Sequence, residues 1–439
     1  MKYRIRPLLI ASLAIGAPLT GCEASFLSGG AQPEQPQWVH RPSGSLSVVY
    51  QVPLVAPIRQ FGEPYQRGGV EVDRLGMRVF VGSSDNGLYS LDAKSGHTLW
   101  RFETTGAVQS APLYDPGDNA VYFGSNDGAL YKVAANNGEF IYRFETNSEV
   151  AERPVLSKGT LYFVNANDTV MALEPKSGKL RWSQHRTPAA GMEIAGYSGP
   201  LVWRDKVYLG FSDGVVMAYD AETGAERWQP VDLASEAEQV VGDVPKYLDV
   251  DTTPVPDVLE GGPAIYVASI QGGVFALDAE TGAQVWSNSL ASGVTSLMLW
   301  QQPAHLRASG PPALPARKIL IAASGTTGLW GLEPENGTVL WRSRLPQGGV
   351  HNPQGFGGAL LVTASQLGVF LVNPLDGRVI DGIHATDGIS AQAGVAGARA
   401  FILTNGGKLL ALHLTKPVDN WEPSSPDVFA RPADSSRHW

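Results

Sequence analysis

The chain of 439 residues contains one cysteine, Cys22, so disulfide bonds can play no part in its fold. Its eight histidines are scattered, and no two of them stand at the spacing of zinc ligands. The Asp-Asn-Gly segments do not reach the spacing of an EF-hand calcium loop, and no G-x-S-x-G, Walker or H-E-x-x-H motif occurs. These absences predict a protein without catalytic residues, bound metal or cofactor, and therefore not an enzyme.

Charged residues are also scarce, at 17% of the chain, and the formal net charge is −9. No basic run interleaved with aromatic residues occurs, so nucleic acid is not an expected partner. The apolar stretch Leu8–Leu19 near the start has about 12 residues, which is too short to span a bilayer.

Three basic residues within the first six precede that stretch, and Leu19-Thr20-Gly21-Cys22 ends it, which is typical of a secretion signal. The last four residues resemble the bacterial lipobox, in which the signal is cut before the cysteine and the cysteine is acylated. The resemblance implies a signal peptide over 1–21, a lipid-modified Cys22 and a flexible tether over 22–44 that holds the protein to a membrane. In the lipoprotein pattern an aspartate after the cysteine favours inner-membrane retention, so Glu23 favours the outer membrane. The alternative for Cys22 is a buried, unpaired thiol.

Glycine and proline are abundant, with 50 and 31 residues, in short segments along the whole chain. Such punctuation is typical of a turn-dense all-β protein. Within it, a unit of about forty residues recurs. The first copy, Arg78–Trp100, consists of a β-rich run, an Asp-Asn-Gly turn, a second apolar run, an Asp-Ala-x-Ser-Gly turn and a run ending in tryptophan. Further copies lie at 120–142, 160–182, 206–228, 264–286, 319–341 and 359–381, with a partial copy at 399–413.

The repeat predicts an all-β, eight-bladed β-propeller with four-stranded antiparallel blades. The last copy stops before its third strand, and Ser45–Leu54 has the pattern of the strand that it lacks. Pairing of this N-terminal strand into the last blade would close the ring and leave no open sheet edge. The propeller is thus expected over 45–414, followed by a Pro/Ser-rich tail over 415–439.

Five copies end in tryptophan, one in Tyr142 and one in Asp381. A large ring at a fixed place in each blade can pack between neighbouring sheets. We therefore expect a structural, inter-blade role for Trp100, Trp182, Trp228, Trp286 and Trp341.

The repeated Asp-Ala-x-Thr-Gly-x-x-x-Trp unit resembles the tryptophan-docking repeat of dehydrogenases that use pyrroloquinoline quinone. Those enzymes place adjacent cysteines against the quinone and use a bound calcium and a catalytic aspartate. A chain with one cysteine cannot supply the cysteine pair. The resemblance therefore implies the propeller scaffold of these enzymes only. A quinoprotein oxidoreductase remains the alternative function.

Two segments resemble the BamB family, the propeller lipoproteins of the outer-membrane barrel-assembly machine. Leu248–Pro254 is similar to the D-V-D-T-T-P-V segment of that family, and Met192–Pro200 to its L-x-L-R-G-x-S-x-P loop. The resemblance extends across the eight repeats and the lipobox. It implies a non-catalytic lipoprotein on the periplasmic face of the outer membrane. In that family the two loops dock a POTRA domain of the β-barrel insertase BamA, beside other assembly subunits, and assist outer-membrane protein insertion.

Carried over residue by residue, Asp249 and Asp251 would be the acidic contacts, and Met192 and Ile194 the apolar ones. Two carboxylates separated by one residue on an extended chain point the same way and offer a negative edge to a basic partner. The family arginine is Ala195 here, which removes the ionic half of the loop contact or implies a changed partner surface. Two alternatives stay open: the aspartates cap turns, or the propeller binds a different envelope protein or a polysaccharide.

Overall fold

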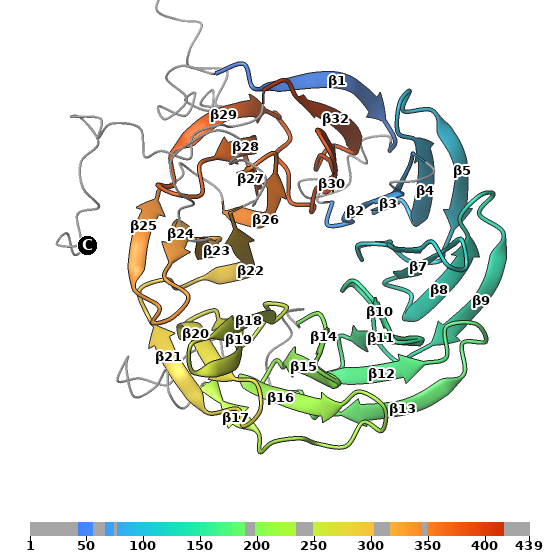
Figure 1. Ribbon diagram of the computed structural model, residues 1–439. Helices are drawn as coiled ribbons and strands as arrows, with labels where there is room; N and C mark the ends of the chain where they lie inside the picture. The colour runs from blue at the N-terminus through green and yellow to red at the C-terminus, as the bar shows by residue number, and fades with distance from the viewer. Residues whose placement is uncertain are drawn as a thin grey trace, which may run out of the picture. The chain divides into compact units, whose positions relative to one another are not determined.

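The computed structural model describes residues 43–55, 66–73, 77–188, 198–233, 249–302, 317–344 and 349–416. The predicted signal peptide, Cys22, Met192 and Ile194 lie outside these residues, as does the tail beyond Lys416. The described part contains thirty-two strands in eight four-stranded antiparallel sheets, arranged in a ring (Figure 1). The predicted eight-bladed propeller is confirmed. Among the described residues, no helix has the length and apolar character needed to cross a membrane.

In blades 1 to 7 the chain runs from an inner strand to an outer strand. Blades 1 to 4 consist of β2 (Val70–Asp73), β3 (Arg78–Ser83), β4 (Gly87–Asp92) and β5 (Thr98–Glu103); β6 (Leu113–Asp115), β7 (Ala120–Gly124), β8 (Ala129–Ala134) and β9 (Phe140–Glu145); β10 (Val155–Ser157), β11 (Thr160–Asn165), β12 (Thr169–Leu173) and β13 (Leu180–His185); and β14 (Leu201–Trp203), β15 (Lys206–Gly210), β16 (Val215–Asp220) and β17 (Val231–Asp232).

Blades 5 to 8 follow the same order, except that the outer strand of blade 8 comes from the start of the chain. They consist of β18 (Val255–Leu259), β19 (Gly262–Ser269), β20 (Gly273–Asp278) and β21 (Gln284–Asn288); β22 (Val294–Gln301), β23 (Lys318–Ser324), β24 (Gly328–Leu332) and β25 (Val339–Ser343); β26 (Val350–Phe356), β27 (Ala359–Ala364), β28 (Gly368–Val372) and β29 (Val379–His384); and β30 (Gly394–Ala396), β31 (Arg399–Leu403), β32 (Lys408–Leu414) and β1 (Leu46–Pro53).

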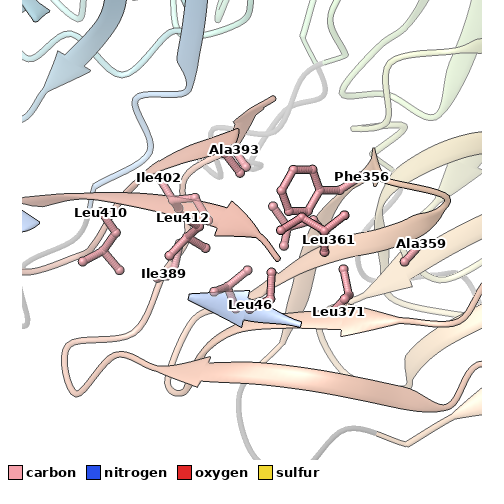
Figure 2. Packing of buried hydrophobic residues seen from close by; sticks show 13 residues of the cluster. Leu46, Phe356, Ala359, Leu361, Leu371, Ile389, Ala393, Ile402, Leu410 and Leu412 are labelled. Atoms are coloured by element: carbon pink, nitrogen blue, oxygen red, sulfur yellow. The ribbon is translucent and has the colours of Figure 1, made fainter. Parts of the chain in front are cut away.

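The two middle strands of each blade supply the core, because neighbouring blades cover both of their faces. Every residue of β7 is buried, whereas exposed and partly buried residues alternate along the outer strand β5. Between blades 7 and 8 the core joins Phe356 and Leu371 to Leu412 and, from the N-terminal strand, Leu46 (Figure 2).

The N-terminal strand closes the ring as expected. β1 pairs antiparallel with β32, from Leu46 opposite Leu414 to Pro53 opposite Lys408, with a bulge between Val48 and Tyr50. The repeat pattern was wrong in blade 4, where a strand was expected to end at Trp228. The outer strand there is β17, which has two residues and begins after that tryptophan.

The ring at the end of each of the first six repeats contacts the following blade. Four indole Nε1–H groups donate to carbonyl oxygens there: Trp100 to Ala135 at 3.1 Å, Trp182 to Ala221 at 3.1 Å, Trp286 to Pro334 at 2.9 Å and Trp341 to Pro374 at 2.9 Å. A glycine with positive φ lies against each ring. A Cβ at Gly138 (φ 71°) would be 2.7 Å from the Trp100 ring, so this close approach requires glycine. The glycine turn of one blade and the tryptophan of the preceding blade therefore depend on each other for their packing.

Tyr50 of β1 occupies the equivalent place in blade 8, and its hydroxyl donates to the Ala93 carbonyl at 3.1 Å. Trp228 packs against Gly282 in the same way, but its Nε1 has no hydrogen-bond partner among the described residues.

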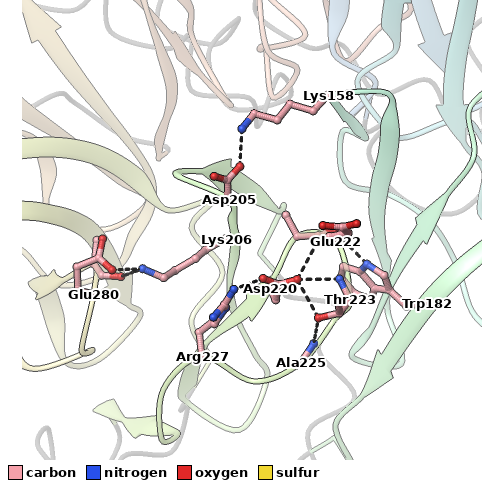
Figure 3. A network of polar contacts seen from close by, with 12 residues as sticks. Lys158, Trp182, Asp205, Lys206, Asp220, Glu222, Thr223, Ala225, Arg227 and Glu280 are labelled. Carbon is pink, nitrogen blue, oxygen red and sulfur yellow. Dashed lines mark hydrogen bonds and ion pairs between the residues drawn. The ribbon is translucent and has the colours of Figure 1, made fainter.

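Ion pairs also join neighbouring blades (Figure 3). Lys158 of blade 3 pairs with Asp205 of blade 4, and Lys206 of blade 4 pairs with Glu280 of blade 5. Within the Asp-Ala-x-Thr-Gly turn of blade 4, the Thr223 hydroxyl and N–H donate to Asp220, which also pairs with Arg227. These contacts lower the pKa of Asp220 to about 2.

Candidate functional site

Successive strands run in opposite directions, so the ring has two faces that carry different segments. We define the connector face as the one on which the outer strand of each blade is joined to the inner strand of the next, for example by residues 104–112 and 146–154. The two segments predicted to dock a partner belong to the connectors on either side of blade 4, one between β13 and β14 and the other between β17 and β18. The described ends of both connectors therefore lie on the connector face. Met192 and Ile194 themselves fall outside the described residues.

The structure separates the two predicted acidic contacts. Asp249 has no exposed surface, and neither of its carboxylate oxygens has a hydrogen-bond partner among the described residues. Val250 packs between blades 4 and 5, so the residues on either side of it point away from that core. Asp251 is partly exposed and lines the central channel. Asp249 is therefore covered in this conformation, whereas Asp251 is accessible from the channel, and the role of both as partner contacts stays a prediction.

Polar cavities occupy the centre of the ring. One of about 270 Å³ is lined mainly by residues that precede or begin the inner strands: Arg67, Gly69, Gln109, Ala111, Glu149, Ala151, Glu152, Arg153, Asp251, Thr295, His351, Asn352, Ser390 and Gln392. Two others, of about 560 and 350 Å³, share Arg153 and Gln392 with it. Because they share walls, the three cavities are adjoining parts of one channel.

Burial and mutual repulsion raise the pKa values of the acidic groups in and beside the channel. Burial, and then the nearby Asp251 carboxylate, raise the pKa of Glu152 to about 7, while Arg67 opposes the shift. Burial and Asp249 raise the pKa of Asp251 to about 7, and burial and Asp168 raise that of Asp249 to about 6. These carboxyl groups therefore exchange protons near neutral pH.

Other polar groups cross the channel or line its walls. Arg153 of the connector before blade 3 pairs with Glu71 of blade 1 at 3.1 Å. His351 Nδ1 and the Thr295 hydroxyl are 3.1 Å apart, and burial together with Arg67 lowers the pKa of His351 to about 4. Among the described residues, no three His, Cys, Asp or Glu side chains are placed to hold a metal ion. The arrangement is chemically suited to binding polar or charged groups.

Sequence reasoning missed Arg67, Glu152, His351 and Ser390, because they lie between the repeat units. A signal for other residues of the channel was present. A proline immediately precedes four inner strands, and the residue before each proline lines the channel: Ala111, Arg153, Gly199 and Thr253.

Known proteins similar to this chain include BamB proteins and enzymes. The curated outer membrane protein assembly factor BamB of Legionella pneumophila is 26% identical over 235 residues, which cover 53% of this chain and 54% of that protein. BamB of Yersinia pestis is 24% identical over 317 residues, or 71% of this chain and 62% of that protein. Quinohemoprotein alcohol dehydrogenase ADH-IIG of Pseudomonas putida is 29% identical over 140 residues, or 30% of this chain and 18% of that enzyme. The chain thus spans between half and two thirds of the length of the two BamB relatives.

Solved structures support the same fold. BamB from Moraxella catarrhalis superimposes with a TM-score of 0.63 at 17% identity, over 84% of this chain and 99% of that one. The family model described as "Outer membrane protein assembly factor BamB" matches residues 60–118, 116–298 and 297–427. Since these matches cover most of the sequence, the chain belongs to the BamB family of β-propellers.

Proposed function

We propose that the protein is a non-catalytic scaffold of outer-membrane protein assembly. In this proposal it is anchored through Cys22 to the periplasmic face of the outer membrane, and it docks a POTRA domain of a BamA-like β-barrel insertase, beside other assembly subunits. Membership of the BamB family supports the assembly role, and the lipobox-like Leu19–Cys22 supports the anchor.

The observation that carries the docking proposal is the position of two connectors on one face. The segments that contain Met192 and Asp249 flank the same blade, blade 4, and begin and end on the connector face. Two neighbouring loops on a rigid ring can offer one continuous contact surface. In this proposal Met192 and Ile194 are the apolar contacts, and Asp249 and Asp251 are the acidic ones. Asp251 is partly exposed, and Asp249 would have to be uncovered when the partner binds.

Co-purification with the insertase tests this assignment. The double substitution Met192→Glu with Ile194→Glu should reduce recovery of the insertase at least about tenfold, because charges at the centre of an apolar contact remain desolvated. The matched control is Val285→Glu on the outer strand β21, where the valine is 50% exposed and distant in sequence from both connectors. Unchanged recovery with the folded double variant would refute the docking surface. Mass spectrometry of proteins retained from native membranes would then identify another envelope protein, and glycan analysis a polysaccharide.

A quinoprotein dehydrogenase is the second candidate, favoured by the similarity to the alcohol dehydrogenase of Pseudomonas putida. The described walls of the three channel cavities do not fit that cofactor well. They offer the rings of Tyr114 and His351 but no tryptophan, and the described residues include no cluster of three metal-binding side chains. Dye reduction with an alcohol after addition of pyrroloquinoline quinone and Ca²⁺ would establish this candidate, and quinone binding without turnover would count against it.

A further inference from the structure

Buried polar atoms that have no hydrogen-bond partner among the described residues lie on two sides of the 270 Å³ cavity. Ser390 is only 7% exposed, lines this cavity, and its hydroxyl has no hydrogen-bond partner among the described residues. On the other side of the ring, Oδ1 of Asp251 is buried and likewise without a partner. Buried polar groups are nearly always hydrogen-bonded, so these atoms are suited to accept hydrogen bonds from a bound molecule.

The charge around the cavity favours a cation. Glu149, Glu152 and Asp251 line it, and Asp249 lies behind Asp251 and raises its pKa. The guanidinium groups that line it are those of Arg67 and Arg153, and Arg153 is paired with Glu71. The cavity is therefore lined by three carboxyl groups and two guanidinium groups, and one of the two guanidinium groups is shared with Glu71.

The kind of cation follows from geometry and size. The described carboxyl groups are not clustered as a metal ion requires. They are instead spread around a space near the small end of ligand pockets, which suits a molecule that brings its own N–H donors. A primary ammonium or a guanidinium group has this character.

We propose that the channel cavity beside Glu152 and Asp251 binds a small organic cation, a primary amine or a guanidine. Glu152 and Asp251 balance its charge, and the Ser390 hydroxyl accepts one of its hydrogen bonds. This site shares Asp251 with the docking surface proposed above, but binding of an amine does not require a partner protein.

Calorimetric titration of the full-length, detergent-solubilised protein with putrescine and with methylguanidine tests the proposal. We expect saturable binding of at least one of them, weakened at least about tenfold by Asp251→Asn and about threefold to tenfold by Ser390→Ala. The matched control is Asp205→Asn, because that carboxylate is 71% exposed and pairs with Lys158 away from the channel. Melting temperatures of all variants show that each is folded.

The pH dependence of binding provides a second readout. Burial raises the pKa of both Glu152 and Asp251; Asp251 acts on Glu152, Asp249 and Asp168 act on Asp251, and Arg67 opposes both shifts. The same cavity also contains Glu149, Arg153 and His351. Putrescine carries its charge throughout the range from about pH 6 to pH 8, so affinity should rise about tenfold across it as the carboxyl groups lose protons. In Asp251→Asn the rise should be smaller.

Three results would overturn the proposal. The first is the absence of amine and guanidine binding at millimolar concentration to the folded protein. The second is equal weakening by Asp205→Asn and Asp251→Asn. Binding of Ca²⁺ or Mg²⁺ alone, without competition from putrescine, would replace the organic cation with a metal and also overturn it. If the insertase displaces putrescine, the natural occupant of the cavity is the ammonium group of a partner lysine. If it does not, the natural occupant is a free amine. Both results keep the cavity as the amine site.

Discussion

At the scale of single residues, the inter-blade tryptophans differ in one measurable respect. The indole N–H of Trp341 donates to the Pro374 carbonyl at 2.9 Å, whereas that of Trp228 has no partner among the described residues. Both rings are more than nine-tenths buried. Trp341→Phe should therefore lower the free energy of unfolding by about 1–2 kcal/mol more than Trp228→Phe, because it alone removes a buried hydrogen bond. Urea denaturation of the two variants measures the difference, and equal losses would show that ring packing alone matters.

The channel carboxyl groups lead to a prediction about pH and stability. Raised pKa values mean that the folded protein holds protons that the unfolded chain has released between about pH 4 and pH 7. The stability that these groups contribute is therefore lost as pH rises through about 7. The melting temperature of the wild type should fall more steeply between about pH 6 and pH 8 than that of Asp251→Asn. His351, whose pKa is lowered, acts in the opposite direction below its usual pKa, but it is present in both proteins and largely cancels. Parallel curves would contradict the prediction.

At the scale of strands, closure of the ring depends on Asp381, which replaces the aromatic residue at the end of the seventh repeat. Elsewhere the ring of one blade packs on the turn before the outer strand of the next blade. In blade 8 the chain ends replace that turn, and Asp381 stands where the ring would be. Its Oδ2 accepts the Leu46 N–H at 2.9 Å, while Thr415 N–H donates to the Ser45 carbonyl at 2.8 Å.

Asp381 should accordingly contribute to the attachment of β1. Asp381→Ala leaves the buried Leu46 N–H without an acceptor and should cost about 1–3 kcal/mol. Asp381→Asn keeps an acceptor oxygen and should cost less. Chemical denaturation measures both losses, and amide exchange at Leu46 should accelerate in the alanine variant. Slow exchange at Leu46 in a destabilised alanine variant would show that the carboxylate does not hold this strand.

Much of the fold could be predicted because each repeat covers the second to the outer strand of a blade, with turn residues at fixed positions. The inner strands escaped prediction, since β6, β10 and β14 have only three residues each and lie outside the repeat. Tyr50 also escaped, because no Asp-Ala-x-Thr-Gly turn precedes it. The channel residues lie on these inner strands and their connectors, so no local pattern brought Arg67 and Ser390 together. Only closure of the ring places them in one cavity.

At the scale of the whole propeller, the two faces separate the chain ends from the proposed docking surface. β1 begins and β32 ends on the face opposite the connectors, because both meet where a turn between third and outer strands would lie. If the proposed tether from Cys22 exists, it would therefore enter the ring on the face away from the connectors that flank blade 4.

Labelling at the two ends of β13 tests this division of the faces. Ser177 lies in the turn before that strand and Thr187 in the connector after it, and both are exposed. A maleimide-linked polyethylene glycol on Thr187→Cys should block co-purification of the insertase by excluded volume, whereas the same polymer on Ser177→Cys should not. Each variant has one new thiol, since Cys22, the only native cysteine, is expected to be acylated. Both polymers extend from the same blade, so they differ chiefly in the face that they cover. Loss of binding with the Ser177→Cys label, and not with the other, would place the partner on the face that carries the chain ends.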